Sequence, residues 1–395
     1  MNDTSMKRPL VPGEKIYWTL EQKGMIHFVT AAEIETLVPT TKDTWRQALQ
    51  LIQAKHPALN YGITGNTSET IHFQQYRNIP IPLNIRPMSA DGLWMHDAEK
   101  ELSMPFDLTR APLVRLTILE RSGGCVVLLT VNHSIGDGLS AAFMLRELVA
   151  TVASLIPAKE SGGLAEAHAH PPVMPERTRF ESAPPITVAY SELGRVFTSH
   201  LIVRAREEKT TVHSAFTAAV IMAIYKISPG WLGDTLGVLH PVSYRKLMDK
   251  RDCFELLAGM QISQYPLNSQ QRFWELAKIV HKSLENARTP GVLDVEMQSL
   301  ERLFSSNLDT NSLYQTLDTL TRHQVLISNL GVVPADNHYG DLKLKAVYGP
   351  MVLPDHHNVQ SFGITTFNDS LTMTLTSRWP VEGLLFAVRE VLQQA

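Results

Sequence analysis

The sequence predicts an α+β fold made of two halves of similar size. Segments with strand-like and helix-like patterns occur in both halves of the 395-residue chain, and no internal repeat relates them. Between the halves, residues 157–185 contain two Pro-Pro pairs, a Gly-Gly pair and no amphipathic period, which is typical of an exposed linker. We therefore predict a first lobe over 1–156, a linker over 157–185 and a second lobe over 186–395.

The strongest pattern in the first half runs from a strand through a short loop into a helix. Residues 125–131 are apolar except for Thr130, which suits a central strand buried on both faces. Residues 140–156 then place apolar side chains at helical spacing. Upstream, we expect a helix beginning near Trp45, a strand around 71–76 and an alternating strand around 114–118.

The second half shows a comparable mixture of elements. We expect helices over 211–227 and 271–287, shorter helical stretches within 296–322, a strand over 325–330 and a hairpin over 362–376. Asn368 and Asp369 stand between the two apolar runs of the hairpin, where turn residues are needed.

Composition excludes several classes of protein. A formal net charge of −3 argues against a dominant nucleic-acid-binding or polybasic membrane surface. The only cysteines are Cys125 and Cys253, so neither a disulfide framework nor a thiolate metal site is expected, and a cytoplasmic location fits best. The N-terminus lacks the apolar core of a signal peptide, and the apolar helix over 212–227 is short and broken by polar residues, so we expect no transmembrane segment.

A histidine follows the buried strand directly and is the leading catalytic candidate. The loop between strand and helix reads His133-x-x-x-Asp137-Gly138. An imidazole held at a rigid strand end can remove a proton near neutral pH. The alternative is a structural histidine at the surface, which is the commoner role of an isolated histidine in a short motif.

The spacing H-x-x-x-D-G resembles the signature of the acyltransferase superfamily that includes chloramphenicol acetyltransferase, plant BAHD enzymes, condensation domains and polyketide-associated acyltransferases. Five further segments resemble this superfamily in the expected order: 45–59, 106–119, 211–225, 240–245 (Pro-x-x-x-Arg) and 327–331 (Ser-Asn-x-Gly). Two departures stand out. Asn132 replaces the first histidine of a doubled pair, and no Asp-Phe-Gly-Trp-Gly segment occurs, so polyketide-associated, alcohol-acetyltransferase-like and stand-alone condensation enzymes are the nearest relatives.

The resemblance implies two lobes of mixed sheets flanked by helices, with a tunnel between them. It implies that His133 is the general base of a direct acyl transfer without a covalent acyl-enzyme. Asp137 would form a salt bridge to Arg245, although it could instead be an exposed N-cap of the following helix. Gly138 would keep the substrate channel open, or simply permit the backbone turn.

The stabiliser of the oxyanion stays open among several donors. Asn132, Ser328, Asn329 and backbone N–H groups near Gly138 are all candidates, and the segment around Ser328 is equally typical of a turn that ends a strand. No metal site is predicted, because His356-His357, with Asp355 and His338 nearby, lack a recognised ligand spacing. No G-x-S-x-G or phosphate-loop pattern occurs.

The sequence therefore predicts an acyltransferase without a permanently bound cofactor. Acyl-CoA or the phosphopantetheine thioester of an acyl carrier protein would be the donor, and a small alcohol or amine the acceptor, with ester formation slightly preferred. Two alternatives remain: a stand-alone condensation enzyme joining carrier-bound substrates, and a catalytically silent relative that binds an acyl carrier.

Overall fold

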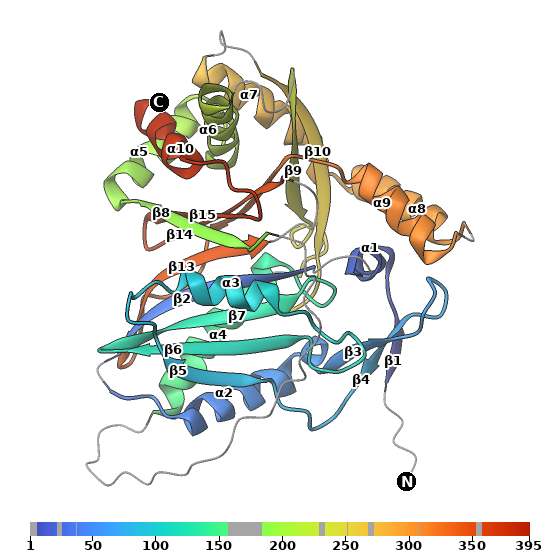
Figure 1. Ribbon diagram of the computed structural model, residues 1–395, viewed down its shortest axis with the longest axis vertical. Helices are drawn as coiled ribbons and strands as arrows, with labels where there is room; N and C mark the ends of the chain where they lie inside the picture. The colour runs from blue at the N-terminus through green and yellow to red at the C-terminus, as the bar shows by residue number, and fades with distance from the viewer. Residues whose placement is uncertain are drawn as a thin grey trace.

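The computed structural model describes residues 6–21, 26–36, 38–156, 184–228, 234–250, 252–267, 272–306, 308–352 and 358–395. Two six-stranded sheets form its two halves, each flanked by helices (Figure 1). The predicted α+β, two-lobed architecture is thus confirmed. Most of the predicted linker, residues 157–183, lies outside the described residues.

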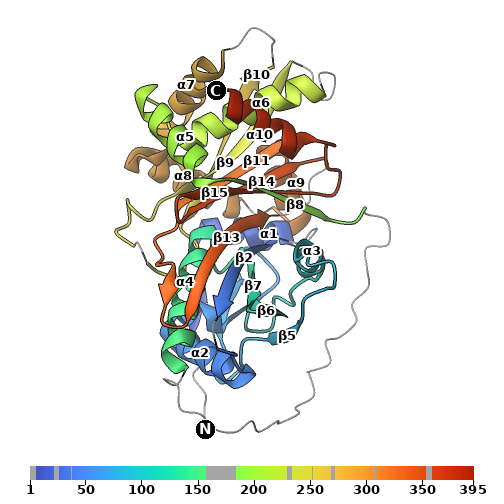
Figure 2. The same ribbon diagram turned by 90° about the vertical axis from the view of Figure 1, so that its left-hand side faces the viewer.

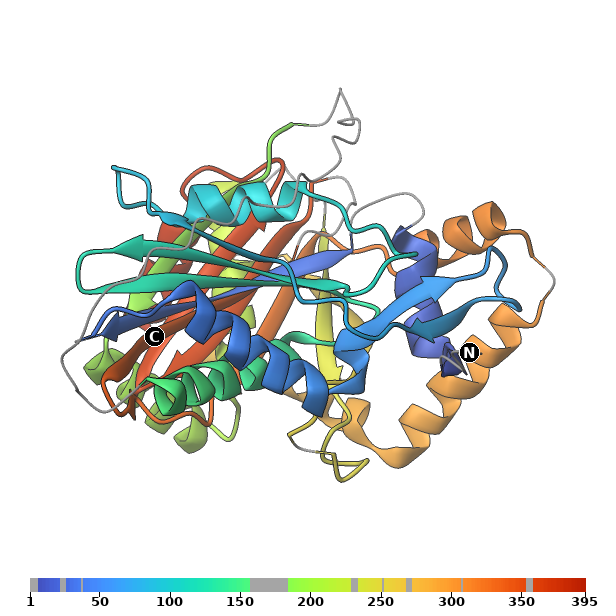
Figure 3. The same cartoon turned by 90° about the horizontal axis from the view of Figure 1, so that it is seen from below.

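The first sheet has the strand order β12-β13-β2-β7-β6-β5. Its strands are β2 (His27–Thr36), β5 (Leu83–Pro87), β6 (Val114–Arg121), β7 (Gly124–Asn132), β12 (His338–Tyr339) and β13 (Leu342–Val352). The predicted apolar strand is β7, and it is buried because β2 and β6 flank it and helices cover both faces. Helices α2 (Lys42–Lys55) and α4 (Gly138–Leu155) lie on one face, and α3 (Met95–Ser103) lies on the other (Figure 3).

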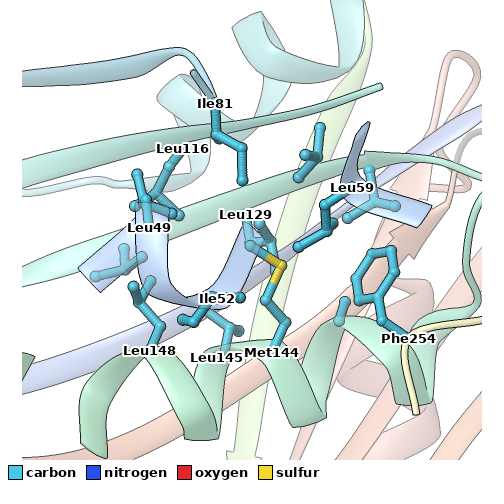
Figure 4. Packing of buried hydrophobic residues seen from close by; sticks show 14 of the residues in the cluster. Leu49, Ile52, Leu59, Ile81, Leu116, Leu129, Met144, Leu145, Leu148 and Phe254 are labelled. Carbon is cyan, nitrogen blue, oxygen red and sulfur yellow. The ribbon is translucent and has the colours of Figure 1, made fainter. Parts of the chain in front are cut away.

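The packing of α2 and α4 fixes the position of the loop that carries the motif. Leu49 and Ile52 of α2 meet Leu145 and Leu148 of α4 beneath the sheet (Figure 4). These side chains are at most 3% exposed, so α4 is held along its length by apolar burial, and its first residue follows the motif loop directly. Phe254, from the second half of the chain, joins the same cluster near the start of α4.

The second sheet has the strand order β10-β9-β11-β14-β15-β8. Its strands are β8 (Thr187–Leu193), β9 (Thr235–Ser243), β10 (Ala258–Pro266), β11 (Val325–Val332), β14 (Gln360–Phe367) and β15 (Ser370–Ser377). The flanking helices are α5 (Arg195–Glu207), α6 (Val212–Ile227), α7 (Phe273–Leu284) and α10 (Leu384–Gln394) (Figure 2). The predicted helix over 211–227 and the predicted hairpin are confirmed as α6 and as β14 with β15.

Two strands of the second half, the short β12 and the long β13, belong to the first sheet. β13 pairs antiparallel with β2, and it also packs against β14 and β15 of the second sheet. Residues from both halves therefore meet along β13, next to the end of β7 that carries the motif (Figure 2).

The remaining elements form a small sheet and a helical arm. The sheet contains β1 (Lys7–Pro9), β3 (Tyr61–Thr64) and β4 (His72–Gln75), and the single turns η1 (Pro57–Asn60) and η2 (Glu285–Arg288) are 3-10 helices. The predicted helical region within 296–322 resolves into α8 (Pro290–Phe304) and α9 (Thr310–Leu320). Both helices pack against α1 (Pro12–Glu21) at one end of the molecule (Figure 1).

Within the described residues, two helical segments are long and apolar enough to cross a membrane by length and composition alone: α4, and the bent pair α5 with α6. Both pack against the sheets as core helices, with α4 against α2 and the first sheet and α6 inside the second apolar cluster.

Candidate active site

The backbone around the motif loop is fixed by strand pairing. β7 ends at Asn132, and the backbone N–H of His133 donates to the carbonyl oxygen of Ile26 at 3.0 Å. Because side chains alternate along a strand, Asn132 and His133 point to opposite faces of the sheet. His133 accordingly meets Phe28, whereas Asn132 lies on the face that carries His27.

The His133 ring is held between two aromatic side chains. It stacks on Tyr17 at 4.1 Å between ring centroids, with 7° between the planes, and it meets the edge of Phe28 at 5.0 Å. Its Nδ1 is buried and has no hydrogen-bond partner beyond its own residue in the described part of the chain. We infer that Nε2 faces the adjoining cavity, where its lone pair can accept a proton.

Burial lowers the pKa of His133 to about 4, and the nearby Asp137 carboxylate offsets only part of this effect. Desolvation has this sign because a charged imidazolium is disfavoured in an apolar environment. His133 is therefore neutral at pH 7, which is the form a general base requires.

The lowered pKa of His133 predicts that activity declines only at unusually low pH. Activity needs neutral His133, so kcat/KM of the free enzyme should stay flat as pH falls from 8 to about 5 and decline only as pH falls through about 4. Initial rates measured over pH 3.5–8, with tryptophan fluorescence followed in parallel to detect unfolding, test this. An inflection near 6.5, the value of an ordinary histidine, would show that the ring is not desolvated in the functional state.

Asp137 and Arg245 form a buried ion pair. Nη2 of Arg245 donates to Oδ1 of Asp137 at 2.8 Å, and each residue is 4% exposed. The other carboxylate oxygen accepts from the backbone N–H of Leu257 at 2.9 Å. Arg245 also donates to the carbonyl oxygen of Cys253 at 2.8 Å, so the pair ties the motif loop to the segment before β10.

Asp137 is also the N-cap of α4. Its Oδ1 accepts from the backbone N–H of Ser140 at 2.9 Å, and the hydroxyl of Ser140 in turn accepts from the backbone N–H of Asp137 at 3.2 Å. The two roles considered for Asp137, salt bridge and N-cap, thus coexist, although the cap is buried rather than exposed. With both carboxylate oxygens occupied, Asp137 serves to hold the loop and is not placed to relay protons.

Gly138 stands where α4 begins and where the cavity wall is tight. A Cβ atom at this position would lie 2.9 Å from Cδ2 of Leu330 and 3.0 Å from Cγ of Pro350. Both neighbours line the cavity, so a side chain at this position would have to displace atoms of the cavity wall.

We expect Gly138→Ala to raise KM and to lower stability by about 1–3 kcal/mol, the usual cost of overpacking. Steady-state kinetics and denaturant unfolding measure the two effects. Gly291→Ala in α8 is the matched control, because a Cβ atom there meets nothing within 4 Å. Equal changes in KM and in unfolding free energy for Gly138→Ala and Gly291→Ala would show that the cavity wall at Gly138 accommodates a methyl group without strain.

A cavity of about 130 Å³ adjoins His133 and is walled by both halves of the chain. The first half contributes Tyr17, Leu20, Ile26, Phe28, His133 and Gly138, and the second contributes Leu239, Met260, Thr321, His323, Ser328, Asn329, Leu330 and Pro350. Among the described lining residues the only Asp, Glu, Lys or Arg is Asp137, which is paired with Arg245. The cavity therefore suits an uncharged and largely apolar group.

The structure separates the predicted oxyanion candidates. Ser328 and Asn329 line the cavity from β11, and the side chain of Asn329 accepts from the backbone N–H of Gly331 at 2.7 Å, as in a turn. Asn132 is not among the lining residues, because it points to the opposite face of β7. Ser328 and Asn329 thus remain the side chains within reach of a substrate in this cavity.

Sequence reasoning missed several lining residues. Tyr17 comes from α1, which was not predicted, and Phe28 from β2, which was not predicted either. His323 lies just before β11 and donates from Nδ1 to the carbonyl oxygen of Thr321 at 2.5 Å. The largely apolar run over 28–34, rich in residues that favour strands, could have indicated β2, but no local pattern brings Tyr17 or His323 to His133.

A larger groove of about 800 Å³ lies outside this cavity. Lys55, His56, Phe143, Arg146 and Asp336 are among its walls, and His133 is not. We place the candidate site in the smaller cavity because His133 lines it.

No group of three or more potential metal ligands occurs within the described residues. His338 lies on β12, where its Nδ1 bonds to the side chain of Asn337 at 2.9 Å. The other histidines considered, His356 and His357, lie with Asp355 outside the described residues.

Parts of the chain are similar in sequence to known proteins. Residues 183–376 match the family model described as phthiocerol/phthiodiolone dimycocerosyl transferase C-terminus. Polyketide synthase PksN of Bacillus subtilis (strain 168) is 26% identical over 151 residues, which are 36% of this chain and 3% of that protein. Malpinin synthetase of Mortierella alpina is 43% identical over 156 residues, which are 35% of this chain and 2% of that protein. The chain thus spans only 2–3% of the length of these curated relatives.

Solved structures resemble the chain over nearly its whole length. Polyketide synthase associated protein 5 from Mycobacterium tuberculosis superposes with a TM-score of 0.67 at 14% identity, covering 99% of this chain and 98% of that chain. Trichothecene 15-O-acetyltransferase from Fusarium sporotrichioides gives 0.71 at 12% identity, covering 98% and 95%. The first condensation domain of the calcium-dependent antibiotic synthetase gives 0.70 at 16% identity, covering 98% and 96%. At these identities the likeness shows the shared fold.

Proposed function

We propose that this chain is an acyltransferase of the chloramphenicol acetyltransferase-like and condensation-domain superfamily, and that it transfers an acyl group from a thioester to a hydroxyl group. The single observation that carries this proposal is the neutral His133 ring, clamped between Tyr17 and Phe28 at the wall of an apolar cavity. The thioester would be acyl-CoA or the phosphopantetheine arm of an acyl carrier protein.

The proposed step moves one proton through His133. The acceptor hydroxyl donates its hydrogen to Nε2 as its oxygen attacks the thioester carbonyl, so a carbon–oxygen bond forms. The carbon–sulfur bond then breaks, and the imidazolium returns the proton to the leaving thiolate. Because burial lowers the pKa of His133, its cation is a strong acid in this site, which favours the second transfer. No covalent acyl-enzyme forms.

The oxyanion that forms during attack needs a donor in the same cavity. We propose that Ser328, whose hydroxyl lies on the cavity wall, or the amide of Asn329 beside it supplies this donor. Asn132 has no part in this step because it faces away from the cavity.

The character of the cavity favours an alcohol over a charged amine as acceptor. No unpaired carboxylate lies among its described lining residues, so an ammonium group would enter without a counter-charge. A stand-alone condensation enzyme remains the second candidate, supported by the matches to condensation domains. A silent carrier-binding role is disfavoured, since His133, Asp137, Gly138 and Arg245 are all in place.

A paired acceptor panel tests the proposal. Purified protein is incubated with acyl-CoA or acylated carrier protein and with a primary alcohol or a primary amine of the same chain length, while free thiol and product mass are followed. We expect ester formation to exceed amide formation. Amide as the main product would favour the condensation reading, and the absence of either product with both donors would reject acyl transfer.

A further inference from the structure

His27 and Asn132 lie side by side beneath the motif loop. They are directly opposite residues in the antiparallel pairing of β2 with β7, so their side chains project from the same face of the sheet, toward α3. Both are almost fully buried, with exposures of 1% and 2%. The residue that follows β7 is His133, which points to the other face and meets Phe28.

The hydrogen-bond partner of His27 fixes its tautomer. Nε2 lies 3.2 Å from the carbonyl oxygen of Glu101, at the C-terminal end of α3. A carbonyl oxygen can only accept, so Nε2 carries the hydrogen and Nδ1 of the neutral ring carries a lone pair. Burial and the nearby Arg115 cation lower the pKa of His27 to about 3, which keeps the ring neutral. Nδ1 is buried without a hydrogen-bond partner among the described residues.

The partner of Asn132 fixes the orientation of its amide in the same way. Oδ1 lies 3.1 Å from the backbone nitrogen of Ser134, which can only donate, and 2.6 Å from the hydroxyl of Ser134. The amide nitrogen Nδ2 is therefore the donor end, and it too is buried without a partner in the described part of the chain.

We propose that Nδ2 of Asn132 donates a hydrogen bond to Nδ1 of His27, directly or through one buried water, and that this pair positions His133. An unpartnered donor and an unpartnered acceptor stand opposite each other on neighbouring strands, and buried polar groups of this kind are normally hydrogen-bonded because leaving them unsatisfied is destabilising. A single buried water commonly bridges such groups.

The pair links the catalytic loop to a buried ion pair. Nε of Arg115 donates to Oε2 of Glu101 at 2.6 Å, and the carbonyl oxygen of Glu101 accepts from His27. Asn132 completes the path by binding Ser134, one residue beyond His133. His27 and Asn132 are thus positioning residues. This role accounts for the amide at position 132, because its Nδ2 supplies the hydrogen-bond donor that Nδ1 of His27 otherwise lacks.

Two substitutions of His27 separate the Nδ1 contact from general burial. The amide of Asn occupies nearly the place of Nδ1, whereas the longer Gln places its amide near Nε2. His27→Asn should therefore keep the contact with Asn132, and His27→Gln should keep only the contact with Glu101. His72→Gln is the matched control, because His72 lies in the small sheet and bonds to Thr64.

A double-mutant cycle of His27→Gln with Asn132→Leu tests the pair by denaturant unfolding, which needs no substrate. We expect the loss in the double variant to fall well short of the sum of the two single losses, as for residues in one network. Additive losses, or equal unfolding midpoints for His27→Asn and His27→Gln, would overturn the contact, whether or not the proposed function holds.

The positioning role rests on the proposed function and is tested by measuring kcat and KM of the His27 variants. We expect His27→Gln to lower kcat about tenfold with KM nearly unchanged, and His27→Asn to restore most of that loss, while His72→Gln has no effect. An unchanged kcat in His27→Gln, with the unfolding cycle still coupled, would reduce the pair to a purely structural contact and overturn its positioning of His133.

Discussion

We expect His133→Ala to lower kcat by about 100-fold to 10,000-fold while leaving the fold intact. Burial keeps the ring neutral, and Tyr17 and Phe28 clamp it at the cavity wall, so the substitution removes a base that is already oriented for proton transfer. Stopped or continuous thiol-release assays give kcat, and circular dichroism with denaturant unfolding confirms the folded state.

The matched control for this substitution is His72→Ala, which removes a histidine from β4 in the small sheet. It should leave kcat unchanged. Near-normal acyl transfer by folded His133→Ala protein would remove His133 from the mechanism.

We expect Asp137→Ala and Arg245→Ala each to lower the free energy of unfolding by about 3–5 kcal/mol, with activity falling as well. Removal of one partner leaves the other charge buried, because each residue is 4% exposed. The Asp137 change also removes the cap of α4 and the acceptor for the backbone N–H of Leu257. Because both substitutions break the same contact, the double variant should lose much less than the sum.

The surface pair Lys250–Glu255 is the control for this cycle. Its atoms lie 2.6 Å apart, but each side chain is 45% exposed, so its removal should cost at most about 1 kcal/mol. Additive losses for Asp137 and Arg245, or full stability with activity lost only in Asp137→Ala, would reject the structural bridge and assign the carboxylate a direct catalytic role.

Local patterns predicted the elements that lie close in sequence. The largely apolar run of β7, the helical spacing of α4 and the turn residues Asn368 and Asp369 each depend on their own segment, and the structure has all three. The pairing of β13 with β2 joins residues about 300 positions apart, and nothing in either segment specifies its partner. Local sequence therefore indicated two lobes, but not the strand that joins them.

The sequence predicted those residues of the candidate site that stand in a recognisable motif. His133, Asp137 and Arg245 stand at motif positions, and the structure places Asp137 against Arg245. The walls of the cavity come from α1, β2, β9, β11 and β13, so only the folded chain reveals that Tyr17 stacks on His133. Because side chains alternate along a strand, the sequence could already have indicated that Asn132 and His133 face opposite sides of the sheet. The motif alone did not suggest this difference in orientation.

The most direct test of the central claim is the dependence of thiol release on the acceptor. Wild-type protein is mixed with an acyl thioester in the presence and absence of a primary alcohol, and free thiol, ester and intact protein mass are measured together. Direct transfer predicts one ester for each thiol, no early burst of thiol without alcohol and no increase in protein mass. A burst of thiol without alcohol, together with a protein heavier by one acyl group, would contradict transfer through His133 as a general base.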